Sequence, residues 1–210
     1  MTANLLTLTT IGLVHFLAAM SPGPSFLVTA RTAVSQSRGD GIKVALGLGA
    51  GTTLWSAATI LGLNFLFGQL HWLFMGMKVA GALLLLWIAY QTFWHAADPV
   101  EMPEGVSIEK GHSPLVRGFL MQISNPKVVV FFGSIFVAML PSEVPAWMIV
   151  ALIAILTMNE IVWYSLVSLL FGSSPARRLY FVTKRWIDRA AGAFLGLLGL
   201  RLLWQASEAA

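Results

Sequence analysis

The sequence predicts an all-α polytopic membrane protein. Hydrophobic residues make up 57% of the 210 residues and charged residues only 10%, with a mean hydropathy of +0.78. Several nearly uncharged runs reach about twenty residues, the length that an α-helix needs to cross the hydrocarbon core of a bilayer. The basic residues lie between these runs and form no stripe, so the net charge of +4 indicates membrane topology and no nucleic-acid partner.

Six apolar runs are long enough to span a membrane, and we expect six transmembrane helices. They cover residues 5–28, 44–67, 72–93, 119–140, 146–171 and 186–204. The sixth run carries Asp188 and Arg189 near its start, so five spans followed by an amphipathic terminal helix is the alternative. No basic residue precedes the first run, unlike a secretory signal, and we expect this run to be a retained span that enters from the outside.

Basic residues mark the first, third and fifth connections between these runs, and the second and fourth connections have none. By the positive-inside rule the odd connections are cytoplasmic, which places both termini on the outer side. The longest connection is a polar cytoplasmic linker at residues 96–114, between a three-helix half at residues 1–95 and a second half at residues 115–210. The basic residues concerned are Arg31, Arg38, Lys43, Lys110, Arg117, Arg177, Arg178, Lys184, Arg185 and Arg189.

Two short segments interrupt the first and fourth runs with residues that break helices. Residues 20–25 are Met-Ser-Pro-Gly-Pro-Ser and residues 124–127 are Ser-Asn-Pro-Lys. Proline lacks the N–H donor and its ring clashes with the carbonyl one turn back, so each segment frees backbone groups. In lipid such backbone is tolerated only inside protein or beside a wet cavity, which predicts a binding site. The candidate substrate-binding residues are Ser21, Pro22, Gly23, Pro24, Ser25, Asn125, Pro126 and Lys127.

The two halves are related in sequence. Phe16 and Ser21 have the same spacing as Phe119 and Ser124, which aligns the two breaks. Each half contains an odd number of predicted spans, so the second half enters the membrane upside down relative to the first. The sequence therefore predicts two inverted three-helix repeats within a single membrane domain, with helices 1 and 4 broken and the site near the membrane midplane between the halves.

At each break, one half-helix ends with free carbonyls and the next begins with free N–H groups, which suits a zwitterion. We expect a substrate carboxylate at the N–H groups after Pro24, assisted by Lys127. We expect the substrate ammonium at the carbonyls of Ala18, Met20 or Gln122. The alternative is a kink that neighbouring helices fill.

Glu160 lies well inside the fifth run. A carboxylate in lipid is unfavourable unless it is paired or functional, so we expect Glu160 to couple transport to protons or to bind the substrate ammonium. The structural alternative is a static ion pair with Lys127 or Lys78. His15, about two turns above Pro22, is a candidate proton relay, and the alternative is a hydrogen-bonded packing residue.

Cysteine is absent, which excludes a disulfide, a thiolate metal site and a dithiol redox pair. We expect no enzymatic activity, no cofactor and no metal site. Glycines with small-xxx-small spacing, such as Gly47 and Gly51, predict close contacts between helices, either within the chain or in a homodimer.

Short motifs in a fixed order run through nearly the whole chain. They are Val14-His15, residues 20–24, 32–38, 125–127 and 132–136, Glu160 with Trp163, and residues 185–188 and 191–193. With these motifs the sequence resembles the lysine exporter superfamily, and within it the branch of homoserine and threonine exporters. The resemblance implies an inner-membrane protein with periplasmic termini that exports amino acids from a bacterial cytoplasm in exchange for protons.

The expected cargo is a neutral polar amino acid such as threonine or homoserine, because one buried acid, Glu160, neutralises one ammonium and no second cationic group. Ser25 stands where several relatives have an acid or amide, which makes it a candidate for tuning substrate choice. Leucine-like or cationic amino acids are the alternative cargo, and metal cations a more distant one because cysteine ligands are lacking. A passive channel would differ by its independence of a proton gradient.

Overall fold

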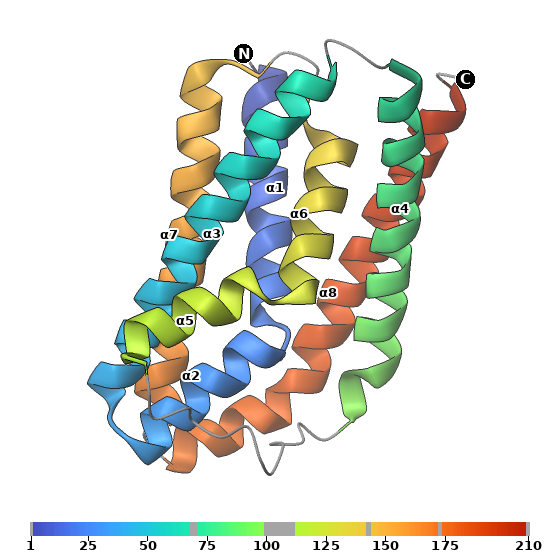
Figure 1. Cartoon of the computed structure of the whole chain (residues 1–210). Helices are drawn as coiled ribbons and strands as arrows, with labels where there is room; N and C mark the ends of the chain where they lie inside the picture. The colour runs from blue at the N-terminus through green and yellow to red at the C-terminus, as the bar shows by residue number, and fades with distance from the viewer. Residues whose placement is uncertain (1, 68–70, 99–111, 142–143, 172–173, 209–210) are drawn as a thin grey trace.

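The structure, a computed structural model, describes residues 2–67, 71–98, 112–141, 144–171 and 174–208. Every regular element within these ranges is helical, which confirms the predicted all-α class. The helices are α1 (Thr2–Met20), α2 (Pro24–Ser35), α3 (Arg38–Phe67), α4 (His71–Trp94), the 3-10 helix η1 (His95–Ala97), α5 (Pro114–Ile123), α6 (Pro126–Met139), α7 (Ala146–Phe171) and α8 (Ser174–Glu208). The long helices form a bundle in which α1 begins and α8 ends at the same end (Figure 1).

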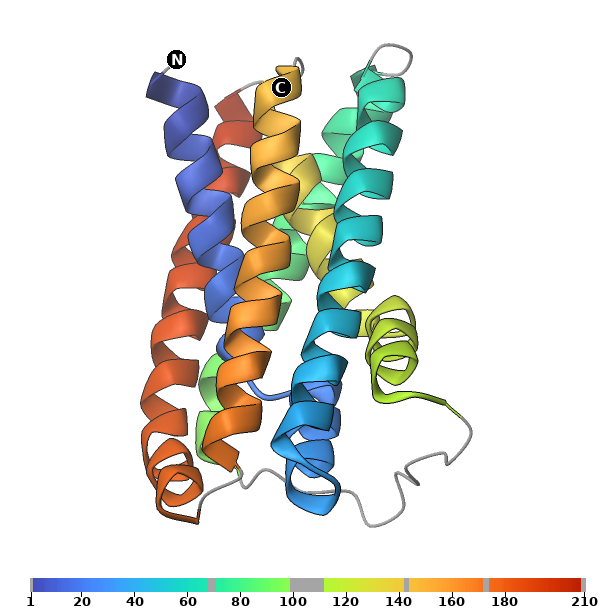
Figure 2. The same ribbon diagram turned by 90° about the vertical axis from the view of Figure 1, so that its left-hand side faces the viewer.

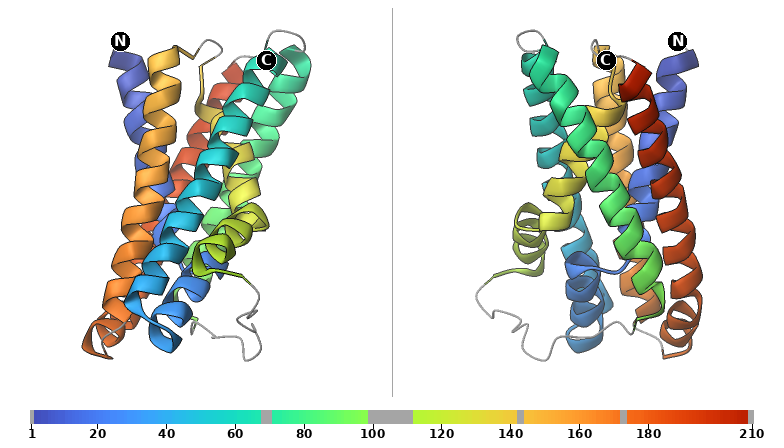
Figure 3. Two further views of the ribbon diagram at one scale, coloured as in Figure 1. Left: turned by 60° about the vertical axis from the view of Figure 1, so that its left-hand side comes forward. Right: turned by 90° about the vertical axis from the view of Figure 1, so that its right-hand side faces the viewer.

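Four helices among the described residues are long and apolar enough to cross a membrane. They are α1, α3 over Arg38–Gly62, α4 with η1 over Val79–Ala97, and α7. The bent pair of α5 and α6 adds a fifth when it is counted as one span. The chain is therefore a multi-pass membrane protein. The sixth predicted run lies within α8, a continuous helix of 35 residues that lies beside α4 (Figure 3).

The first predicted span is broken where its two prolines lie. Helix α1 ends at Met20, and α2 begins at Pro24, which occupies its first turn. Proline suits that position because the N–H of a first-turn residue has no helical partner in any case. Gly23 precedes α2 in an extended conformation, and its carbonyl accepts the first hydrogen bond of the helix from the Leu27 N–H at 3.0 Å. The break is thus a feature of the fold, as predicted.

The fourth predicted span is also two helices, α5 and α6, which meet at a bend of 52°. Asn125 caps α6, and its side-chain oxygen accepts a hydrogen bond from the Lys127 N–H at 3.0 Å. Helix α5 lies across the bundle in Figure 1, and Figure 2 shows it nearly end-on. The second break is therefore confirmed, and the helix before it departs from the direction of its neighbours.

Apart from Lys110, which lies outside the described residues, these basic residues lie on helices rather than in the loops that we predicted. Arg31 belongs to α2, Lys43 to α3 and Arg117 to α5. The predicted fifth loop is the first part of α8, which begins at Ser174 and not at residue 186. These loop boundaries were wrong because charge marks where a helix leaves the lipid, whereas its backbone hydrogen bonding continues beyond that point. Most of the predicted linker, residues 99–111, lies outside the described residues.

Helices from the two halves of the chain pack against each other. Helix α3 contacts α5 and α7, α1 contacts α7, and α4 contacts α8. Glycines permit some of these contacts: Gly47 faces the backbone of Leu115 in α5, and Gly51 faces the side chain of Gln122. Gly192 of α8 lies against Phe93 of α4 in the same way. The predicted small-residue faces therefore hold helices of the same chain together.

Candidate substrate site

Polar side chains from several helices meet where the two breaks come together. Ser25 of α2, Gln122 of α5, Asn125 of the second break and Glu160 of α7 are all buried. Thr52 of α3 is buried beside them. Buried polar groups of this kind need partners, because an unmade hydrogen bond inside a protein costs the full desolvation of the group. Their hydrogen bonds accordingly form one connected network.

Ser25 joins the two breaks. Its Oγ accepts a hydrogen bond from Asn125 Nδ2 at 3.0 Å and donates one to Gln122 Oε1 at 3.0 Å. The Nε2 group of Gln122 in turn donates to Thr52 Oγ1 at 2.8 Å. The predicted break residues Ser25 and Asn125 thus lie in direct contact, although 100 positions separate them in the chain.

Glu160 is held by Gln122 and faces His15. Gln122 Nε2 donates to Glu160 Oε1 at 2.7 Å, and His15 Nε2 lies 3.6 Å from Glu160 Oε2. The imidazole of His15 is buried and sits against the rings of Phe131 and Phe132. The two candidate proton-coupling residues are therefore neighbours, which their sequence positions did not indicate.

Lys127 reaches the end of α1. Its Nζ donates to the carbonyl of Ala18 at 3.0 Å and to that of Ser21 at 3.2 Å. Among the described residues it forms no ion pair with Glu160, so that predicted pair is not observed. The side chain of Lys78, the other predicted partner, lies outside the described part of the chain.

Two of the carbonyls that we expected to bind the substrate ammonium accept hydrogen bonds from within the chain. We predicted that the carbonyls of Ala18, Met20 or Gln122 would bind a substrate ammonium. The Ala18 carbonyl is bound by Lys127, and the Gln122 carbonyl accepts the Asn125 N–H at 3.4 Å. The physical reason is that carbonyls at a helix end need donors, and a long amine from the opposite break supplies them within the chain.

The structure contains two adjacent cavities at the breaks. A cavity of about 40 Å³ lies within the polar network, with Ser25, Gln122 and Glu160 in its wall. It has room for water but not for an amino acid. A second cavity of about 450 Å³ lies against α4 and α8, and its volume is in the range of small-molecule sites, roughly 300–1,000 Å³. Ser21 and Lys127 line both cavities.

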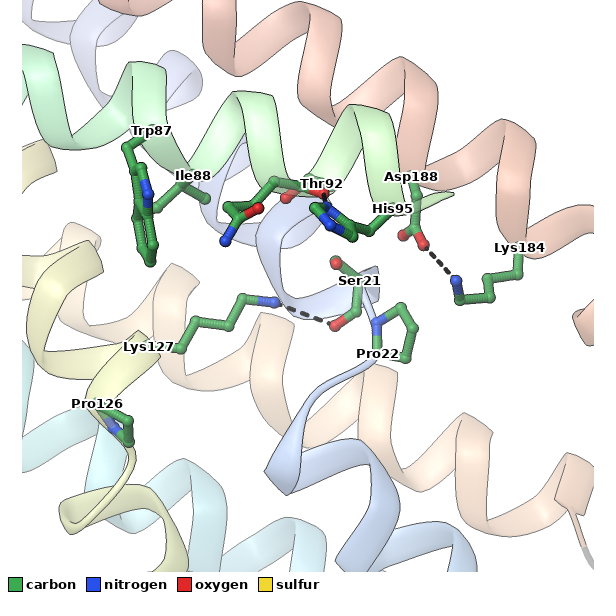
Figure 4. Close-up of a pocket in the computed structure, with 11 residues that line it drawn as sticks. Ser21, Pro22, Trp87, Ile88, Thr92, His95, Pro126, Lys127, Lys184 and Asp188 are labelled. Atoms are coloured by element: carbon green, nitrogen blue, oxygen red, sulfur yellow. Dashed lines mark hydrogen bonds and ion pairs between the residues drawn. The ribbon is translucent and has the colours of Figure 1, made fainter. Parts of the chain in front are cut away.

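The larger cavity brings together predicted and unpredicted residues (Figure 4). Its wall includes Ser21, Pro22, Pro126 and Lys127 from the breaks. It also includes Asp188, which the sequence suggested only as a polar interruption of the last run. Of the other predicted residues, Gly23, Ser25 and Asn125 line the small cavity, and Pro24 is exposed at the start of α2. Sequence reasoning missed the side chains of Gln122 and Thr52, for which the only signal was a polar residue in an apolar run.

Ser25→Ala is expected to lower the free energy of unfolding by about 1–3 kcal/mol, because it leaves Asn125 Nδ2 and Gln122 Oε1 buried without their partner. Thermal unfolding of the purified protein in detergent measures this change. Ser207→Ala, at an exposed position near the end of α8, is the matched control and should unfold like the wild type. Equal unfolding temperatures for Ser25→Ala and the control would show that the hydroxyl does not stabilise the junction of the breaks.

A multi-pass helical protein in which two interrupted helices join at a polar site beside a cavity has the architecture of a membrane transporter. The sequence pattern of the family described as LysE type translocator matches residues 16–206. The chain belongs to this family.

Individual relatives agree with this membership. The chain is 32% identical to the threonine efflux protein of Salmonella typhi over 197 residues, which cover 92% of this chain and 96% of the relative. It is also 32% identical to the threonine efflux protein of Escherichia coli K12, with the same coverage. The leucine efflux protein of Enterobacter sp. strain 638 is 24% identical, over 87% of this chain and 86% of the relative. No solved structure matches the chain significantly.

Proposed function

We propose that this protein exports neutral polar amino acids, such as threonine and homoserine, from a bacterial cytoplasm in exchange for protons. Family membership and the threonine efflux relatives support an amino-acid exporter. The observation that carries the proposal is the junction of the two helix breaks, where Lys127 lines a cavity of about 450 Å³ and the buried carboxylate of Glu160 lines the adjacent cavity of about 40 Å³.

The proposed topology has six spans arranged as two inverted three-helix repeats in the inner membrane, with both termini in the periplasm. Three features support it. The start of α1 and the end of α8 lie at the same end of the bundle (Figure 1), and each half of the chain begins with a broken helix. The turn between α2 and α3 lies at the opposite end, among the basic residues that the positive-inside rule assigns to the cytoplasm.

Proton coupling is assigned in this proposal to Glu160, with His15 as its relay. Glu160 is 3% exposed, and among the described side chains its basic partner is the imidazole of His15, at 3.6 Å, rather than a lysine or an arginine. A carboxylate of this kind can exchange a proton, whereas a carboxylate in a tight ion pair with lysine or arginine would remain ionised. Intramembrane acids of this description form the proton relays of transporters.

Export of an apolar amino acid is the second candidate function. The leucine efflux relative favours it, as do Trp87 and Ile88, which present apolar surface to the larger cavity. The two candidates share the backbone chemistry of the cargo and differ only in its side chain.

Uptake into inside-out membrane vesicles tests the proposal. With an interior-acid pH gradient, vesicles containing the protein should accumulate labelled threonine and homoserine, and dissipating the gradient should abolish this accumulation. Leucine and arginine are assayed in parallel, and vesicles without the protein are the control. Accumulation of leucine alone would support the second candidate. The absence of gradient-driven uptake of all four amino acids by folded protein would overturn the proposal.

A further inference from the structure

The larger cavity lies between the helix breaks on one side and α4 and α8 on the other (Figure 4). Trp87 and Ile88 form an apolar part of its wall, and Gln91 and Thr92 add polar groups from the same helix. Three charged side chains line it: Lys127 from α6, and Asp188 with its partner Lys184 from α8. Charged groups within a membrane protein are unfavourable unless they are paired or bind something, so each needs an explanation.

Asp188 is only partly satisfied by the protein. The residue is 3% exposed, and its Oδ2 pairs with Lys184 Nζ at 3.2 Å. Its Oδ1 is buried and has no hydrogen-bond partner among the described residues. Lys184 cannot move to serve both oxygens without losing other bonds, because its Nζ also donates to the carbonyls of Ala96 and Asp98, each at 3.1 Å. Asp188 therefore presents its Oδ1 as an acceptor at the wall of the cavity, with the Ser21 side chain beside the carboxyl group.

Lys127 presents the opposite charge to the same cavity. Two hydrogen bonds, to the carbonyls of Ala18 and Ser21, hold its ammonium, which has three donors. These two carbonyls are its hydrogen-bond partners within the described part of the chain, so the third donor can meet an anion in the cavity. Lys127 lines both cavities, so its side chain lies between the cavity that contains Asp188 and the small cavity that contains Glu160.

We propose that the larger cavity binds the zwitterionic part of the cargo, with the ammonium at Asp188 Oδ1 and the carboxylate at Lys127. The cargo side chain then lies along the α4 wall, where Thr92 and Gln91 suit a hydroxyl group and Trp87 suits a methyl group. This inference rests on the proposed function and adds to it a binding residue, Asp188. Asp188 takes the place of the backbone carbonyls as the proposed ammonium site, because the Ala18 carbonyl already accepts a hydrogen bond from Lys127 Nζ.

The test compares ligands that lack one charge. Threonine, 3-hydroxybutyrate, which lacks the ammonium, and threoninol, which lacks the carboxylate, are titrated against purified protein, and the ligand-induced rise in unfolding temperature reports binding. The wild type should bind threonine about tenfold or more tightly than either analogue, as expected for a lost charged hydrogen bond. Asp188→Asn should bind threonine and 3-hydroxybutyrate equally while still preferring threonine to threoninol. Lys127→Met should bind threonine and threoninol equally while still preferring threonine to 3-hydroxybutyrate.

Two further variants separate binding from folding. Asp188→Glu keeps the charge and should retain part of the preference for threonine over 3-hydroxybutyrate. Asp40→Asn removes an acid at the start of α3, away from the cavity, and should behave as wild type. If Asp188→Asn weakens all three ligands equally, or keeps the wild-type preference, the inference is overturned while the proposed function stands. If the wild type binds neither threonine nor leucine, the proposed function and this inference both fail.

Discussion

Glu160→Gln is expected to abolish pH-driven amino-acid export while leaving the fold intact. Glutamine has the size of glutamate and can accept the same hydrogen bond from Gln122 Nε2, which measures 2.7 Å in the structure. Its amide can also donate to His15 Nε2, which lies 3.6 Å from the present Oε2. Only the exchangeable proton is lost. In inside-out vesicles, accumulation driven by an interior-acid gradient should fall to the level seen without a gradient.

Exchange without a gradient is the internal control for this variant. If Glu160 serves coupling and not cargo binding, vesicles loaded with unlabelled threonine should still exchange it for labelled threonine. Loss of both activities, with an unchanged unfolding temperature, would reassign Glu160 to cargo binding. Undiminished pH-driven accumulation by Glu160→Gln would disprove its role in coupling.

Gly47→Ala is expected to destabilise the protein strongly, because helices α3 and α5 approach too closely for a side chain there. A Cβ atom at Gly47 would overlap the carbonyl oxygen of Leu115 and lie 2.7 Å from the N atom of Phe119. Both are backbone atoms of α5, so no side-chain rotation can relieve the overlap. Overpacking of this kind costs about 1–3 kcal/mol and sometimes more. Displacing α5 also displaces Gln122, so transport should fall together with stability.

Gly62→Ala is the matched control, since it lies in the same helix and a Cβ there would meet nothing within 4 Å. Unfolding of both variants in detergent, followed by tryptophan fluorescence, should give a clearly lower midpoint for Gly47→Ala and a wild-type midpoint for Gly62→Ala. Equal midpoints for the two variants would show that α5 can move away from α3 without loss of stability.

The positions of the helix breaks could be predicted from the sequence because the effect of proline is local. Pro22, Pro24 and Pro126 cannot donate a backbone hydrogen bond wherever the chain runs, so a helix must end near them. The predicted fifth span, residues 146–171, likewise has the bounds of α7, since a long apolar run without prolines has few other structures available in lipid. The starts of α3 and α8 were less predictable, because polar residues continue a helix beyond the membrane without any change in hydrophobicity.

The pairing of charged and polar side chains could not be predicted in the same way. Lysines and carboxylates in a membrane protein suggest pairs, and an ion pair of Glu160 with Lys127 or Lys78 was the structural alternative that the sequence left open. In the structure Lys127 binds two carbonyls of the first break, Glu160 binds Gln122 and faces His15, and Asp188 pairs with Lys184. The partner of a side chain depends on how far each helix is rotated about its axis and shifted along it relative to its neighbours. The sequence of a single helix does not determine that rotation and shift.

The sequence by itself determined that this chain is helical, crosses a membrane several times, breaks its first and fourth apolar runs at proline, and carries a buried acid at Glu160. These properties follow from hydrophobicity and backbone chemistry, which act over a few residues. Only the tertiary structure decided that Ser25 joins the two breaks, that Lys127 donates a hydrogen bond to the Ala18 carbonyl, and that Asp188 lines a cavity of about 450 Å³. These features depend on contacts between helices distant in sequence, because close helix packing alone sets which side chains share a space.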